Sequence, residues 1–267
     1  PCTAVPLIST LPACPRSPHS FPTLALRHKA SGFLTYELRD AGFPAAVLRD
    51  AGSTLVDLKA AYFTVEQLLE ANYTYEKLKQ VGFTPMEFKD GGVPAPQLRR
   101  IGFDVEQLKA GGFSAKDIKG TGQWDMDLVR EVRLHFTAKE LKNSGLSAKE
   151  LKAVNFSVKE LEAAGFSGKE LRNAGFTGSD LRSVNFQAGG LRAVGYTVGE
   201  LREAGFSVPE LRDGGFTATD LKAAHISPIE LKQSGFTAKQ LRAEGFAAKE
   251  LTGGFEAREL KEIGYKA

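Results

Sequence analysis

The sequence is poor in the residues that build catalytic, redox and metal sites. Its 267 residues include two cysteines, four histidines, two methionines and one tryptophan. The histidines are scattered, and no His, Cys or Asp spacing matches a metal site. The sequence also lacks a nucleophile elbow, a Ser/His/Asp set and a GxxxxGK[ST] phosphate loop. We therefore expect no enzymatic activity, no metal and no cofactor.

Long apolar runs and a strong charge imbalance are missing as well. No run approaches the roughly 18–20 apolar residues that span a bilayer, so no membrane span is expected. The 35 basic and 32 acidic residues leave a formal charge of +3. A dedicated nucleic-acid binder usually carries a clear basic excess, so this balance argues against that class.

Proline and cysteine are concentrated at the N-terminal end. Residues 1–22 contain six of the 12 prolines and follow no period, which predicts an extended arm or linker. Both cysteines, Cys2 and Cys14, lie in this arm. Their separation permits a disulfide that closes a short loop, and two free thiols are equally compatible with the sequence.

The abundant feature is a ten-residue repeat. An apolar residue, usually Leu, recurs every ten residues from Leu38 to Leu128, again from Leu141 to Leu251, and once more at Leu260. These positions define about 23 copies. A second apolar series, mostly Phe, lies five residues before the first. The chain therefore belongs to the repeat proteins, in which each unit packs on its neighbours.

Two spacings break the period. Thirteen residues separate Leu128 from Leu141, and three extra residues are about one helical turn, so we expect a longer helix there. Nine residues separate Leu251 from Leu260, which predicts a connection one residue shorter. After the arm, the predicted organisation is a first repeat block, a phase-breaking insertion and a second repeat block, at residues 23–128, 129–135 and 136–267.

Each repeat favours a short helix over a β-helical coil. The residue two before the Leu is often charged, as Lys139 is, and burying it in a narrow β-helix would cost several kcal/mol. The helix meets no such conflict. Thr137 is a preferred N-cap, Glu140 completes a capping box, and Gly145 stands where a helix ends in a left-handed residue.

A helix of about two turns does not persist alone in water, so neighbouring repeats must hold it. Phe and Leu side chains, each contributing about 1.5–3 kcal/mol when buried, are the expected core. We predict an all-α protein, a rod-like α-solenoid or superhelix of about 23 ten-residue repeats. Representative core residues are Phe136, Leu141, Leu151, Phe156, Phe166 and Leu171.

The repeated pattern resembles the decapeptide GF(S/T)xxELxxA repeats of microbial proteins whose function is uncharacterised. The resemblance covers about residues 33–265 and implies a short-helix α-solenoid. It transfers no activity to this chain.

Two charged rows run along the repeats. A basic residue directly follows the Leu, as Lys142 does. An acidic residue lies two positions before this basic residue, as Glu140 does. A regular cation row is compatible with nucleic-acid binding along a phosphate backbone. The paired acidic row favours a simpler interpretation, in which both rows are solvated and match the helix dipole.

Three further residues have open interpretations. Asn72 and Asn155 lie in N-glycosylation sequons, but each also replaces the glycine that ends a helix. Trp124 precedes the insertion and marks either a partner site or bend, or a longer helix that the superhelix absorbs. We favour the structural interpretation for all three. The sequons and the arm tilt the expected location towards the cell surface or exterior.

The expected function is structural. The first hypothesis is a filament or scaffold component that assembles with copies of itself, because the last repeat keeps its apolar stripe and soluble arrays usually need polar caps. The second is a soluble scaffold that binds other proteins. Nucleic-acid binding along the basic row is the third.

Overall fold

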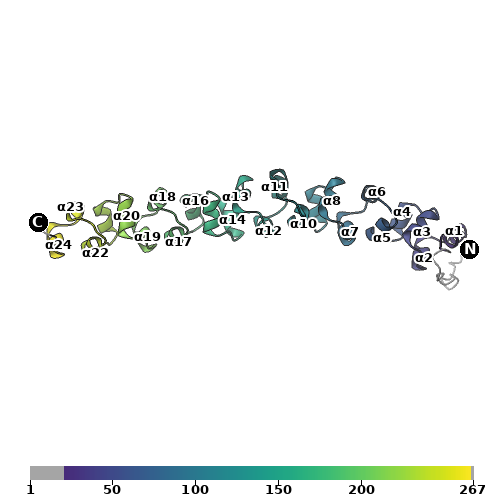
Figure 1. The fold of residues 1–267 in the computed structure, drawn as a ribbon, viewed down its shortest axis with the longest axis horizontal. Coiled ribbons are helices and arrows are strands. Elements are labelled where there is room, and N and C mark those ends of the chain that lie inside the picture. Colours follow the sequence, from purple (N-terminus) through teal and green to yellow (C-terminus); the bar gives the residue numbers. More distant parts are fainter. Residues whose placement is uncertain (1–20, 266–267) are drawn as a thin grey trace, which may run out of the picture. The chain divides into compact units, whose positions relative to one another are not determined.

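The structure, a computed structural model, describes residues 21–265, and all regular structure in this range is α-helical. It contains 24 helices, nearly all of six residues, joined by connections that are mostly four residues long (Figure 1). The chain divides between Trp124 and Asp125 into two compact units. The prediction of an all-α array of short ten-residue repeats is confirmed. Its rod-like form stays a prediction.

The first unit contains ten helices. Their bounds are α1 Phe21–Ala30, α2 Thr35–Asp40, α3 Ala45–Asp50, α4 Leu55–Ala60, α5 Val65–Glu70, α6 Tyr75–Gln80, α7 Pro85–Asp90, α8 Ala95–Arg100, α9 Val105–Ala110 and α10 Ala115–Lys119. The second unit contains α11 Met126–Arg133, α12 Ala138–Asn143, α13 Ala148–Ala153, α14 Val158–Ala163, α15 Gly168–Asn173, α16 Gly178–Ser183, α17 Ala188–Ala193, α18 Val198–Glu203, α19 Val208–Asp213, α20 Ala218–Ala223, α21 Pro228–Gln233, α22 Ala238–Ala243, α23 Ala248–Leu251 and α24 Ala257–Glu262.

Each repeat begins and ends its helix with its own side chains and backbone. At the start of α15, the Oγ of Ser167 accepts the amide of Glu170, and the Glu170 carboxylate accepts the Ser167 amide at 2.7 Å. At its end, Gly175 has φ 81° and donates its amide to Arg172, while the Phe176 amide donates to the Leu171 carbonyl at 3.1 Å. This pair of bonds is a Schellman motif, and it brings the repeated Phe against the repeated Leu.

The helices pack mainly on the helix two repeats away within their unit. Contacts such as α13 with α15 and α17 with α19 dominate, so two repeats bring the chain back over itself. Backbones approach closely there, since a Cβ on Gly214 after α19 would lie 2.9 Å from the Cβ of Ala188 in α17. The Leu and Phe series fill the interior. The six residues singled out from the sequence are all buried: Phe136, Leu141, Leu151, Phe156, Phe166 and Leu171.

At both irregular spacings, the lengths of the helices and connections differ from those predicted. Helix α11 has eight residues, as the longer spacing predicted, but the connection at residues 120–125 also lengthens and α10 has five residues. The predicted insertion at 129–135 therefore lies largely inside α11. The prediction of a shorter connection near the C-terminal end is wrong. The connection at 252–256 is a residue longer than usual, and α23 is cut to four residues, because Thr252–Gly253–Gly254 cannot sustain another helical turn.

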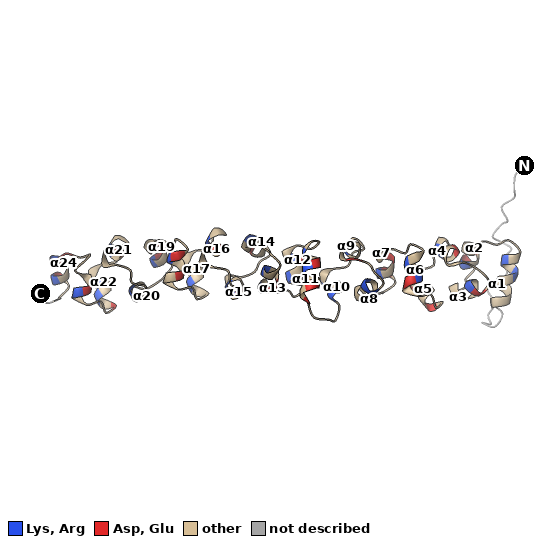
Figure 2. Cartoon of the chain, turned by 90° about the horizontal axis from the view of Figure 1, so that it is seen from above, with Lys and Arg blue, Asp and Glu red and all other residues tan. Residues whose placement is uncertain are grey.

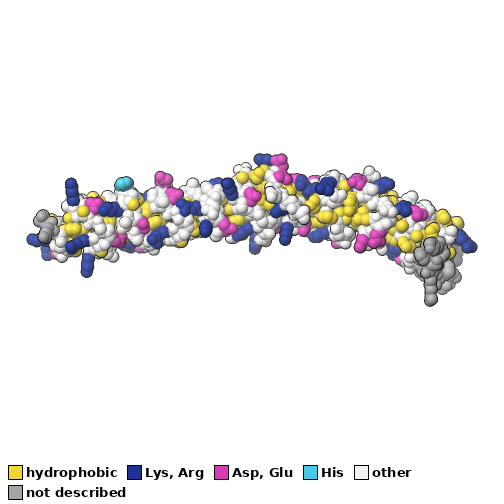
Figure 3. Space-filling view, viewed as in Figure 1, with side chains coloured by type: hydrophobic (Ala, Val, Ile, Leu, Met, Phe, Trp, Pro, Cys, Tyr) yellow, Lys and Arg dark blue, Asp and Glu magenta, His cyan; other side chains and the backbone are white. Residues whose placement is uncertain are grey.

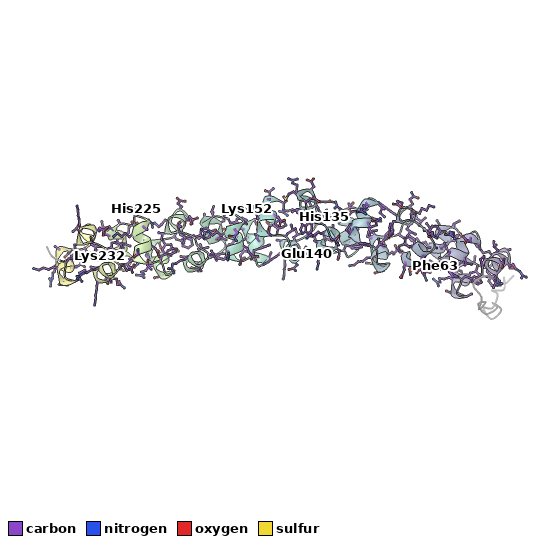
Figure 4. The ribbon with its side chains drawn as sticks, viewed as in Figure 1. Phe63, His135, Glu140, Lys152, His225 and Lys232 are labelled. Atoms are coloured by element: carbon purple, nitrogen blue, oxygen red, sulfur yellow. The ribbon has the colours of Figure 1, made fainter. Side chains whose placement is uncertain are left out.

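The left-handed position after each helix usually holds glycine, but two bulky residues occupy it. Tyr62 has φ 60° and His225 has φ 58°, whereas three further exceptions, Asn72, Asn155 and Asn185, are of a type that tolerates this conformation. Both bulky side chains are exposed (His225 is labelled in Figure 4). These two positions therefore carry local backbone strain.

We expect His225→Gly to stabilise the second unit by about 0.5–1 kcal/mol, because glycine removes the left-handed strain but adds freedom to the unfolded chain. Asn185→Gly is the matched control, with φ 67° and a smaller expected gain. Urea unfolding followed by circular dichroism measures both changes. A loss of stability in His225→Gly would show that the imidazole makes a favourable contact larger than the strain.

Candidate functional site

In most repeats the basic residue after the Leu reaches across the array instead of lying free in solvent. Lys152 in α13 (labelled in Figure 4) is half-buried, and its Nζ donates to the Gly175 carbonyl at 2.6 Å. The same Nζ lies 4.2 Å from the ring centroid of Phe176. Both partners belong to the turn after α15, two repeats further on. We call such contacts, from the basic residue after the Leu to the turn two repeats along, a cation bridge.

Cation bridges recur through both units. In each, a Lys or Arg lies 4.1–5.6 Å from the centroid of an aromatic ring 23 or 24 residues later. The pairs are Lys59–Phe83, Lys79–Phe103, Lys89–Phe113, Arg133–Phe156, Lys142–Phe166, Lys152–Phe176, Arg172–Tyr196, Arg182–Phe206, Arg192–Phe216, Lys222–Phe246, Lys232–Phe255 and Arg242–Tyr265. A half-desolvated cation over a ring contributes between about 0.5 and 2 kcal/mol.

Arg172 shows the full set of partners. Its Nη1 donates to the Val194 carbonyl at 2.7 Å, its guanidinium lies 4.7 Å from the Tyr196 ring centroid, and its Nη2 lies 3.9 Å from a Glu200 carboxylate oxygen. A Cβ on Gly195 would collide with this guanidinium, so the glycine is needed both for its φ of 93° and for the approach of the cation. One side chain of α15 thus holds the turn between α17 and α18.

The acidic row serves the helix starts and also faces these cations. The Glu200 carboxylate accepts the Thr197 amide and hydroxyl at 2.7 and 2.9 Å. The hydrogen bond from the Thr197 amide, helped by the Thr197 hydroxyl and by Arg172, holds the pKa of Glu200 below its usual value. The hydrogen bonds from Ser167 lower the pKa of Glu170 in the same way. The carboxylates are therefore anionic parts of the helix caps.

The charged surface that results is mixed in sign. Figure 2 shows Lys or Arg and Asp or Glu close together on most of the helices. The sequence interpretation, that both rows are solvated and match their own helix, is wrong for most of the basic row, because most of its members are half-buried and contact another repeat. The exposed members include Lys89, Arg192, Arg202, Lys232 and Arg242. Because most basic residues of the row contact other repeats, fewer of them are available to bind a phosphate backbone.

Sequence reasoning missed the cation bridge because its two ends are more than two repeats apart. One signal was present. Where the basic residue is replaced by Leu69, the aromatic residue 24 positions later is replaced by Val93. In this pair the cation and the ring are replaced together, as expected for partners. Elsewhere only one of the two is replaced, since Arg202 is followed 24 positions later by Ile226, so this offset gives only a partial signal.

The other singled-out residues do not meet in one place. Asn72 and Asn155 are exposed and occupy the left-handed position after α5 and α13. Trp124 is half-buried at the end of the first unit, with the Lys119 Nζ 5.8 Å from its ring centroid. Cys2 and Cys14 lie outside the described residues.

Large exposed apolar side chains are present in both units, although most hydrophobic residues are buried. Figure 3 shows apolar side chains between charged ones on the face in view. The most exposed are Tyr62 at 80%, Leu134 at 78% and Val56 at 61%. Side chains of this kind on a repeat surface are candidates for contact with other molecules.

Metal and membrane sites were sought in the same range. Between residues 21 and 265 no group of three or more His, Cys, Asp or Glu side chains is arranged to hold a metal ion. None of the helices in this range has the length and apolar character needed to cross a bilayer.

Comparison with known proteins gives one match. A family model described as "Decapeptide repeat region" matches residues 24–95, 135–207 and 195–267, which together are more than half of the chain. No curated protein and no solved structure matches the chain.

We expect Lys152→Ala to lower the stability of the second unit by about 1–2 kcal/mol, since it removes both a hydrogen bond to a carbonyl and a cation–ring contact. Lys149→Ala is the control, because Lys149 lies on the same helix but is exposed. Chemical unfolding compares the two variants. Equal effects would contradict a structural role for the cation bridge.

The pKa shifts predict acid sensitivity. A carboxyl whose pKa is lower in the folded chain than in the unfolded chain stabilises the fold above the unfolded pKa, and this contribution is lost as the pH falls through the folded pKa. We therefore expect the thermal midpoint to fall as the pH is lowered below 4.5, the ordinary glutamate value. Glu170→Gln should weaken this dependence slightly, because Gln also serves in a capping box but does not titrate.

Proposed function

This chain belongs to the decapeptide repeat family, and we propose that it is a non-enzymatic structural protein that assembles end to end into a filament or scaffold. The proposal rests on one observation, an apolar face of α23 and α24 that no further repeat covers within residues 21–265. The side chains that repeat most regularly support it too, because they serve in caps, core and cation bridges and leave no repeated group for catalysis.

The open face consists of the side chains that interior repeats bury against the helix two positions on. Ala188, the first residue of α17, is 3% exposed because the turn after α19 lies against it. The equivalent Ala248 of α23 is half-buried, and Ala257 of α24 is exposed. A groove of about 560 Å³ lies over them and is lined mainly by apolar groups, among them Phe255, Leu260 and Tyr265.

A second copy of the chain has the same kinds of side chain that cover the equivalent face in interior repeats. Inside each unit the covering groups are the small residue before the left-handed position, the Leu–Phe pair and the cation bridge. A contact between the last repeats of one chain and the first repeats of the next joins two different surfaces, so it does not stop at a dimer. Repetition of such a contact gives an open filament when the rotation between copies does not close a ring.

A second candidate is a soluble scaffold for other proteins. The exposed apolar residues of the first unit favour it, because Tyr62, Val56 and Met86 are each more than half exposed. In this candidate the repeats hold separate contact points at fixed spacing, and the partner binds along the side of the array.

End-to-end assembly predicts that Ala257→Arg keeps the chain monomeric, because a charged side chain placed on the open face would block a covering repeat. The control is Ala223→Arg, the same substitution at an exposed position on the side of α20. Sedimentation velocity over a range of protein concentrations and electron microscopy measure the assembly state. The wild type and the control should assemble.

Two outcomes would contradict the proposal. One is a wild-type chain that stays monomeric at the highest concentration reached. The other is assembly of Ala257→Arg equal to that of the control. Selective loss of a bound protein on Tyr62→Ser, with no change in assembly, would favour the second candidate.

A further inference from the structure

One repeat of the second unit keeps the turn of a cation bridge but lacks its cation. The position after the Leu of α14 holds Glu162, where neighbouring repeats hold Lys152 and Arg172. The aromatic residue 24 positions later is retained as Phe186. Of the aromatic residues in this position between residues 21 and 265, Phe186 is the one that has an acidic residue in place of the cation.

A hollow lies over the turn after α16, and it is larger than the hollow of about 510 Å³ beside Arg172 and Tyr196, where the cation is present. Its volume is about 750 Å³, and it is lined among others by Glu162, Ser183, Val184, Phe186 and Gly190. Phe186 is half-buried, whereas the equivalent Phe206, which lies under Arg182, is 4% exposed. The Phe186 ring is therefore more exposed than the equivalent Phe206 ring, which lies under a cation.

The hydrogen-bond acceptors of the bridge also lie open. In the next repeat the Val194 carbonyl accepts from Arg172, but the equivalent Val184 carbonyl accepts no hydrogen bond from any residue that the structure describes. The Asn185 carbonyl receives only the Gln187 side-chain amide, at 3.4 Å. A ring face and two turn carbonyls thus remain without the positive charge that they accept in the other repeats.

The local charge is balanced and does not repel a cation. The usual acid of the following helix is absent, because Gly190 takes its position in α17, and the negative charge comes from Glu162 on the opposite side. The Glu162 carboxylate forms no ion pair or hydrogen bond within residues 21–265. Lys159 also lines the hollow, and its charge balances that of Glu162, which leaves the carbonyl dipoles and the ring quadrupole to select a cation.

Another repeat without a cation, in α5, is different. Where Leu69 replaces the basic residue, Val93 replaces the ring, so both partners have become apolar together. At Glu162 only the cation has gone, and the groups that would receive it remain. This difference distinguishes an open acceptor site from a repeat that has simply lost its bridge.

We propose that this hollow binds the guanidinium or ammonium group of an Arg or Lys side chain presented by another protein. The incoming group takes the place of the absent cation, with its N–H groups on the Val184 carbonyl and the Glu162 carboxylate and its flat face or ammonium over Phe186. The ligand is a single basic side chain, so each contact is weak, and binding requires a partner that presents it on an accessible segment.

The probe is N-acetyl-arginine amide, titrated into the isotope-labelled full chain and followed by amide chemical shifts. The neutral control is N-acetyl-citrulline amide, which has nearly the same shape without the charge. We expect saturable shifts at millimolar probe, concentrated at residues 159–165 and 183–190, and at least a tenfold weaker response to the citrulline compound. Equal responses to the two probes would overturn the proposal, as would the absence of saturable shifts.

Two variants locate the site. Glu162→Arg restores the cation within the chain, so it should abolish the shifts while raising the unfolding midpoint, and Glu162→Gln should weaken binding several-fold without filling the hollow. Glu106→Arg, an exposed acid of the first unit, makes the same charge change and should leave the shifts intact. Binding that persists in Glu162→Arg would overturn the proposal. These readouts do not depend on assembly, so they are separate from the test of the filament.

Discussion

Every helix of the regular repeats is too short to be stable by itself, and this constraint explains most of the other features. Six residues give about one and a half turns, so nearly every backbone group lies within reach of an end. The amide groups at the start are met by Ser, Thr, Asp or Glu side chains. The carbonyls at the end are met by the left-handed turn and by a cation from two repeats away. The repeats are similar because each must satisfy the same set of groups.

The packing between alternate repeats follows from the same constraint. A two-repeat return places the end of one helix against the start of another, so the close approach of Gly214 to Ala188 is as much a part of the fold as the Leu and Phe core. The charged side chains contribute to this packing. Because a cation such as Arg172 contacts a carbonyl, a ring and a carboxylate at once, its removal disturbs two helices that are not neighbours in sequence.

The sequence is sufficient to predict what happens within ten residues. The N-cap of Thr137, the stop at Gly145 and the buried faces of Leu141 and Phe136 all follow from local rules, and the structure has them. Prediction failed where the outcome depends on contacts across repeats. Lys152 looked solvent-exposed because its partners lie 23 and 24 residues away. Periodicity alone did not give the number of repeats per turn, because that number is set by packing.

Packing between alternate repeats has a consequence for how such chains change in length. Helices with even numbers pack on one another, and so do helices with odd numbers. Gain or loss of one decapeptide keeps the caps and turns of each repeat, but it moves every later helix of the unit from one of these two sets to the other. Residues that shared a side of the array then lie on opposite sides. Gain or loss of two decapeptides leaves the two sets as they were. Surfaces built from several repeats, including any that bind a partner, are therefore conserved only when the length changes by twenty residues at a time.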